Sequence, residues 1–152
     1  MAETEGFDIN QKSALVAIDD EGRRATVTDA LHELGFRVQA AESAEDGYDK
    51  LRKTAFEAVV VDQGFQGGTL LDNPLLKHLQ WMPANTRRYM FLALLAPDVK
   101  TLDNMSAFAA SVNAVVNYND MAQSKAILER GIVENDQFFR VLRTVLQEAG
   151  RR

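Results

Sequence analysis

The chain has 152 residues, of which 46% are hydrophobic, enough for one domain with a buried core. It carries 17 Lys and Arg against 22 Asp and Glu, a net charge of -5, and it has no basic block, so nucleic acid is not an expected partner. Because cysteine is absent, disulfides and thiolate chemistry are excluded, and a reducing compartment is expected.

The two ends and the apolar runs bear on location. Residues 1–12 form a short polar tail without the apolar core of a signal peptide, and residues 13–152 are expected to form a single domain. The longest apolar run, from Met90 to Pro97, is far below the roughly 20 residues that span a bilayer. We therefore expect a cytoplasmic protein that does not enter the membrane.

Strand and helix patterns alternate along the chain. Apolar runs or apolar–polar alternation predict strands, and apolar residues at helical spacing, several with a capping residue before them, predict the helices between them. The predicted strands are 14–18, 36–40, 58–61, 90–96 and 114–116, and the predicted helices are 27–34, 44–55, 74–79, 102–112 and 122–149. Ser43 and Thr101 are the expected N-caps of the second and fourth helices, and Trp81 is expected to pack in the core or at its edge under the third helix.

Five strand–helix units predict an α/β fold with a doubly wound parallel sheet. The second strand alternates apolar and polar residues, as an edge strand does, whereas the first, third and fourth are apolar throughout. This pattern favours the flavodoxin-like order 2-1-3-4-5, with strands one and three side by side.

The C-terminal segment, from about residue 121, is longer than this fold requires. Apolar positions there follow alternating four- and three-residue steps, which indicate a seam like that of a coiled coil. An unbroken helix would reach roughly 40 Å and overhang the sheet, although Gly131 and Asn135-Asp136 leave open two shorter helices. We expect this helix to serve a homodimer or a neighbouring domain, or else to pack on its own sheet.

Acidic residues end the two strands predicted to be neighbours. Asp19 and Asp20 follow the first strand and Asp62 ends the third. Ligands of such sheets bind at the carboxyl ends of the strands, and clustered carboxylates favour a hard cation such as Mg²⁺. A bound metal would let one carboxylate attack a phosphoryl donor. The alternative is that Asp19 and Asp20 only cap the following helix.

The order of these elements resembles the receiver domain of bacterial response regulators over residues 13–120. The segment Leu15 to Asp20 is similar to its first strand and acidic pair, and Val59 to Asp62 to the strand that ends in the phospho-accepting aspartate. The resemblance implies that Asp62 accepts phosphate, that Asp19 and Asp20 hold Mg²⁺, and that the partners are a histidine kinase or other signalling protein and a fused or separate output domain.

The second half departs from the receiver pattern. Where receivers have a Ser or Thr after strand four, Leu95 and Ala96 stand, and where they have a Lys after strand five, Tyr118 stands. Tyrosine donates a hydrogen bond but supplies no positive charge. The resemblance is therefore to a pseudo-receiver with degenerate switch positions. The cations near strand four, Arg87, Arg88 and Lys100, are candidates to replace the lysine, or else ordinary surface charges.

Two functions follow from these residues. The first is a phosphorelay signalling domain that is not an enzyme, in which Asp62 is a Mg²⁺-dependent phospho-acceptor. The second is a phosphorylation-independent module for protein contacts or dimerisation. A third reading, a flavodoxin-like enzyme with a nucleotide or flavin, is disfavoured, because the glycine loop 64–68 lacks both the P-loop ending and the dinucleotide-binding fingerprint. We expect this loop to be a flexible turn.

Overall fold

The computed structural model describes residues 12–150, so most of the predicted polar tail lies outside the described residues. Its central element is a five-stranded parallel sheet in the order β2-β1-β3-β4-β5, which confirms the predicted topology. The strands are β1 (Lys12–Ala17), β2 (Phe36–Ala40), β3 (Ala58–Asp62), β4 (Phe91–Ala96) and β5 (Ala114–Asn117).

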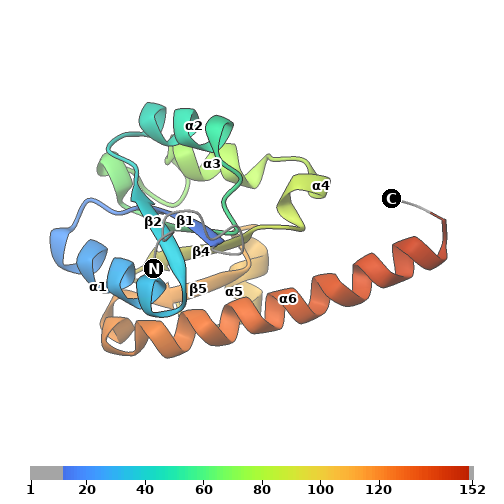
Figure 1. Ribbon diagram of the computed structural model, residues 1–152. Coiled ribbons are helices and arrows are strands. Elements are labelled where there is room, and N and C mark those ends of the chain that lie inside the picture. The colour runs from blue at the N-terminus through green and yellow to red at the C-terminus, as the bar shows by residue number, and fades with distance from the viewer. Residues whose placement is uncertain (1–11, 151–152) are drawn as a thin grey trace, which may run out of the picture.

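Helices cover both faces of the sheet (Figure 1). The α-helices are α1 (Glu21–Glu33), α2 (Ala44–Lys53), α3 (Pro74–Gln80), α4 (Ala84–Arg87), α5 (Asn104–Ala109) and α6 (Ser124–Glu148), and the 3₁₀ helices are η1 (Phe65–Gly67) and η2 (Tyr118–Gln123). Neither α4 nor the 3₁₀ helices had been predicted, because each is too short to show a period.

Two apolar layers form the core, one on each face. Alternate residues of β1, β3 and β4 point to opposite faces, as the pleat requires. One set packs against α2 and α3, and the other against α1 and the first half of α6. Strands β1, β3 and β4 are buried almost throughout, whereas β2 is half-exposed at the edge, as its alternation predicted.

Two local expectations were wrong. The N-cap of α5 is Asp103, whose side chain accepts from the Ser106 N–H, whereas the Thr101 hydroxyl accepts from the Asn117 N–H and bonds to Asp120. Trp81 had been expected to pack under the third helix, but it is 86% exposed. Leucines of α3 already fill the space between that helix and the sheet.

Helix α6 is continuous over 25 residues, about 37 Å at 1.5 Å per residue, and so settles the question of a break. Gly131 lies inside it because a Cβ there would stand 2.9 Å from the Phe91 ring, so glycine permits close docking on the sheet.

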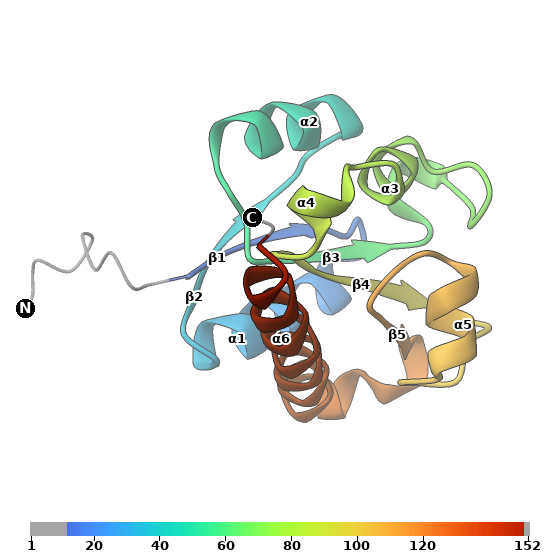
Figure 2. The same cartoon turned by 90° about the vertical axis from the view of Figure 1, so that its right-hand side faces the viewer.

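Asn135 of α6 still accepts from the Asn113 side chain, and Arg143 lies 5.3 Å from the centre of the Tyr89 ring. Figure 2, which looks along α6, shows the helix beside α1. The C-terminal turns of α6 run past the sheet (Figure 1). Among the described residues, no helix is both long and apolar enough to cross a bilayer.

Candidate functional site

Asp62 is the last residue of β3, the central strand, and lies at the carboxyl end of the sheet. The apolar run before it is buried between the two helix layers, and this burial continues to the carboxylate, whose side chain is only 2% exposed. A buried charge is unfavourable unless it is paired and hydrogen-bonded. The partners of Asp62 therefore decide what it can do.

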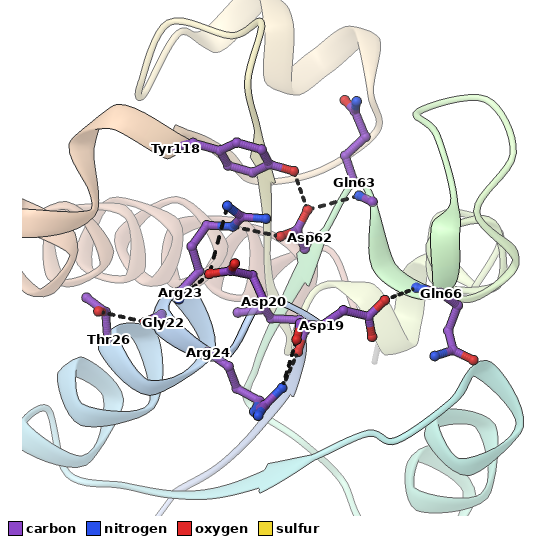
Figure 3. A network of polar contacts seen from close by, with 12 residues as sticks. Asp19, Asp20, Gly22, Arg23, Arg24, Thr26, Asp62, Gln63, Gln66 and Tyr118 are labelled. Carbon is purple, nitrogen blue, oxygen red and sulfur yellow. Dashed lines mark hydrogen bonds and ion pairs between the residues drawn. The ribbon is translucent and has the colours of Figure 1, made fainter.

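Both carboxylate oxygens of Asp62 have partners (Figure 3). Oδ1 accepts from the Tyr118 hydroxyl at 2.5 Å and from the Gly64 N–H at 2.9 Å. Oδ2 accepts from Nε of Arg23 at 3.0 Å. The charge is thus matched by a guanidinium and by two further donors.

Arg23 reaches this position because α1 starts directly after β1. The Asp20 side chain caps the helix by accepting from the Arg23 N–H at 2.8 Å, which fixes the first turn. The Arg23 side chain then extends across the strand ends to Asp62. Its guanidinium carbon lies 3.8 Å from the centre of the Tyr118 ring, a cation–π contact that holds the group against β5.

Tyr118 follows β5 and completes the group. Burial, reinforced by the hydrogen bond to the Asp62 carboxylate, raises the pKa of Tyr118 to about 12 from 10.0. The hydroxyl therefore stays protonated at neutral pH and acts as a donor. Arg23, Asp62 and Tyr118 form one unit, which we call the Arg23–Asp62–Tyr118 cluster.

The predicted metal ligands Asp19 and Asp20 stand at the same end of the sheet but face other partners. Asp19 is exposed and accepts from the backbone N–H of Gln66, while Asp20 caps α1. The alternative that both residues cap this helix therefore holds for Asp20 and not for Asp19. Nη1 of Arg23 stands 4.0 Å from the Asp20 carboxylate, on the side that faces Asp62.

This arrangement does not fit a Mg²⁺ ion shared by the three carboxylates. Within residues 12–150, no three acidic or histidine side chains come together as ligands for a metal. A guanidinium already fills the space between Asp20 and Asp62 (Figure 3). The magnesium site stays a prediction, and we derive no chemistry through it.

The loop after Asp62 is held in place, although it had been expected to be a flexible turn. The buried amide of Asn73 donates to the backbone carbonyls of Asp62 and Gln63, and its oxygen caps α3 by accepting from the Leu76 N–H. Phe65 is buried beneath this loop. These contacts fix Gly64, whose N–H bonds to Asp62.

Leu95 and Ala96, two of the predicted degenerate switch positions, are the last two residues of β4. Leu95 pairs with Asp62 in the parallel register of β3 and β4, and both Leu95 and Ala96 are buried and apolar. Neither offers a hydroxyl beside the Asp62 carboxylate. Tyr118, by contrast, contacts that carboxylate directly.

Two of the three candidate replacement cations lie at the other end of the sheet. Arg87 and Arg88 precede β4 and so lie at its amino end, away from Asp62. Arg87 donates to the backbone carbonyls of Leu79 and Ser111, and burial lowers its pKa. The cation at Asp62 is Arg23, which the sequence reasoning missed. The available signal was its place in the first turn of a helix that begins at the carboxyl end of β1.

Comparison with solved structures assigns the fold. The HemR receiver domain of Leptospira biflexa superimposes with a TM-score of 0.60 at 20% identity, covering 80% of this chain and 94% of that one. A response regulator from Thermotoga maritima gives 0.61 at 17% identity, covering 81% and 98%. NtrX from Brucella abortus gives 0.66 at 16% identity, covering 92% and 30%. The chain therefore has the fold of response regulator receiver domains.

Sequence comparison reaches a shorter segment. The sensory/regulatory protein RpfC of Xanthomonas campestris pv. campestris is 34% identical over 85 residues, which are 56% of this chain but 11% of RpfC. The chain thus spans a small part of the length of this relative. No family model matches the chain.

Proposed function

We propose that this chain is a non-enzymatic signalling module of receiver fold that acts through protein–protein contacts without phosphorylation of Asp62. The observation that carries the proposal is the Arg23–Asp62–Tyr118 cluster, in which both oxygens of the candidate acceptor are already bonded. The receiver fold supports a role in two-component signalling, and the cluster favours the phosphorylation-independent form of that role.

The chemistry of acceptance argues in the same direction. To attack a phosphoryl donor, a carboxylate needs an oxygen that the donor can reach. Asp62 is 2% exposed, and an attack through either oxygen would first have to displace Arg23 or Tyr118. A phosphoryl group would also add negative charge where one guanidinium already balances the carboxylate.

The parts that would transmit phosphorylation are changed as well. Leu95 and Ala96 present no hydroxyl, and the tyrosine in the place of the lysine donates to the unmodified carboxylate. We therefore propose that the site around Asp62 keeps one conformation and does not switch. The expected partners are a histidine kinase or other signalling protein, or an output domain on the same or another chain.

Labelling with a small phosphodonor tests this function. We expect no mass increase at Asp62 when the protein is incubated with acetyl phosphate and Mg²⁺, and no ligand density beside Asp62 in crystals grown with beryllofluoride. Asp62→Asn is the control for labelling elsewhere on the chain. A mass increase in the native protein that is lost in Asp62→Asn would establish the other candidate function, a Mg²⁺-dependent phospho-acceptor.

The distal half of α6, residues 133–148, is the surface we propose for these contacts. Phe138, Val141 and Val145 follow helical spacing and are 64%, 65% and 53% exposed. They lie in the C-terminal half of α6 (Figure 1). Exposed apolar side chains grouped in this way favour self-association or a partner helix.

Sedimentation of a variant tests this surface. If the distal half of α6 mediates self-association, Phe138→Ser/Val141→Ser/Val145→Ser will sediment as a smaller species than the native protein. Gln137→Ser/Gln147→Ser changes exposed polar residues of the same segment and is the matched control. An identical oligomeric state in both variants and the native chain would remove α6 from this role.

A further inference from the structure

We infer that the guanidinium of Arg23 is a tethered cation that takes the place of a divalent metal at the acidic end of this sheet. It lies against two carboxylates, with Nε 3.0 Å from Asp62 and Nη1 4.0 Å from Asp20. The position is set by a helix that starts at the end of β1, so the cation comes with the fold. This inference rests on the proposed function and deepens it by naming the group that pairs with the Asp62 carboxylate and covers it.

The electrostatics exclude a second cation while Arg23 is in place. At a few Å, and with the screening typical of a protein surface, unit charges interact by several kcal/mol. A divalent ion beside Asp62 would meet the guanidinium at such a distance and would have to share a carboxylate that is already neutralised. Mg²⁺ could enter only after Arg23 had moved out.

The chemistry and the contacts of Arg23 favour its position beside Asp62. A guanidinium remains charged at all ordinary pH values and is more weakly hydrated than an ammonium ion, so it tolerates partial burial. The side chain of Arg23 is 28% exposed, and its plane lies over Tyr118. The Tyr118 hydroxyl in turn bonds to Asp62, so displacing Arg23 would break a contact with each of its neighbours.

The same contacts explain why the acidic residues do not repel one another. Asp62 is neutralised by Arg23, Asp20 lies at the positive end of α1, and Asp19 accepts from Gln66. Groups of the chain thus provide the positive charge and the donors that a bound metal would otherwise provide. The stability of this protein should not depend on divalent cations.

Titration with Mg²⁺ and Mn²⁺ tests the inference in the full chain. In the native protein we expect no Mg²⁺-dependent rise in Tm and no Mn²⁺ broadening of the amide signals of Asp19, Asp62 and Gly64. In Arg23→Ala the carboxylates lose their cation. We expect that broadening to appear and Tm to rise by about 3–6 °C when Mg²⁺ reaches roughly ten times its dissociation constant.

Two further variants keep the test decisive. Arg23→Gln retains the length and a donor group without the charge, and replaces Arg23→Ala if that variant does not fold. Arg24→Ala is the matched control, because Arg24 is the next residue of α1 and its side chain donates to the backbone carbonyls of Ile18 and Asp19. Arg24→Ala should respond to Mg²⁺ as the native protein does.

Either of two results would overturn the inference. One is Mn²⁺ broadening around Asp62 in the native protein equal to that in the Arg23 variants. The other is a folded Arg23→Gln protein that shows no response to either metal. Phosphodonor labelling is read separately, so native protein that binds Mg²⁺ at Asp62 without being labelled would overturn the tethered cation and leave the proposed function standing.

Discussion

Around Asp62 the polar groups are paired with one another, whereas along the distal half of α6 apolar groups face solvent. The Asp62 carboxylate, 2% exposed, is matched by Arg23, Tyr118 and the Gly64 N–H. Phe138 and Val141, in contrast, are each more than half exposed. A reactive site is ordinarily accessible to its substrate, whereas the apolar residues of the fold around it are buried. Here the candidate reactive group is buried and apolar residues of α6 are exposed.

The two regions stabilise different states of the protein. A closed polar cluster stabilises the fold and fixes its charges, but it covers both oxygens of the carboxylate that would react. Exposed apolar side chains give little stability in the isolated chain, and they gain it when a partner covers them. This contrast is why we propose that contacts along α6 carry the function and that the cluster has a structural role.

Among changes to the Arg23–Asp62–Tyr118 cluster, removing Arg23 should have the largest effect on stability. Arg23→Ala leaves the Asp62 carboxylate buried without its cation, and we expect the free energy of unfolding to fall by about 2–3 kcal/mol. That is below the roughly 3–5 kcal/mol for a fully buried pair, because Arg23 is partly exposed. Urea denaturation in EDTA measures the loss.

A second substitution separates the unpaired charge from lost packing. Arg23→Ala/Asp62→Asn has no buried carboxylate, so it should recover part of the lost stability and be more stable than Arg23→Ala alone. If both variants lose the same free energy of unfolding, Arg23 contributes only packing. The claim that the cluster is stabilised by charge pairing would then be wrong.

Tyr118→Phe should have a smaller effect that depends on pH. Loss of a hydrogen bond to a charged group is expected to cost about 1–2 kcal/mol at neutral pH. The pKa of Tyr118 is raised to about 12 in the folded protein, above its ordinary value of 10.0, so the folded state holds this proton more tightly. Its contribution is therefore complete below about pH 10 and is lost as the pH rises towards 12.

The measurement is the difference in unfolding free energy between the native protein and Tyr118→Phe, from about pH 9 to about pH 12. We expect the difference to shrink across the upper part of this range. Tyr89→Phe, a change at a tyrosine that is 59% exposed, is the control. A difference that stays constant with pH would show that the hydroxyl does not bond to Asp62.

The apolar pattern of the sequence predicted the strands and their order. The apolar runs that became β1, β3 and β4, and the alternation in β2, report burial directly, so the strand order could be inferred. The place of Asp62 at the end of a buried strand followed from the same pattern.

The partners of Asp62 could not be inferred in this way. Arg23 lies 39 residues before Asp62 and Tyr118 lies 56 residues after it, and no periodicity records such contacts. The cations near β4 were sought because they stand close to a switch position in sequence. The parallel strands place Arg87 and Arg88 at the opposite end of the sheet. The partners of Asp62 thus depend on how far each side chain extends as well as on the order of the strands.

The smallest effect on stability is expected on the open side of the comparison. Phe138→Ala/Val141→Ala removes exposed apolar groups and should change the unfolding free energy of the monomer by less than about 0.5 kcal/mol per residue. Leu128→Ala, in the buried part of the same helix, should cost about 2–5 kcal/mol and is the contrasting control. Urea denaturation at several protein concentrations separates the two contributions, because stability from self-association grows with concentration. A large loss in Phe138→Ala/Val141→Ala at the lowest concentration would mean that the distal half of α6 is held by its own domain, and the surface proposed for partners would then be part of the fold.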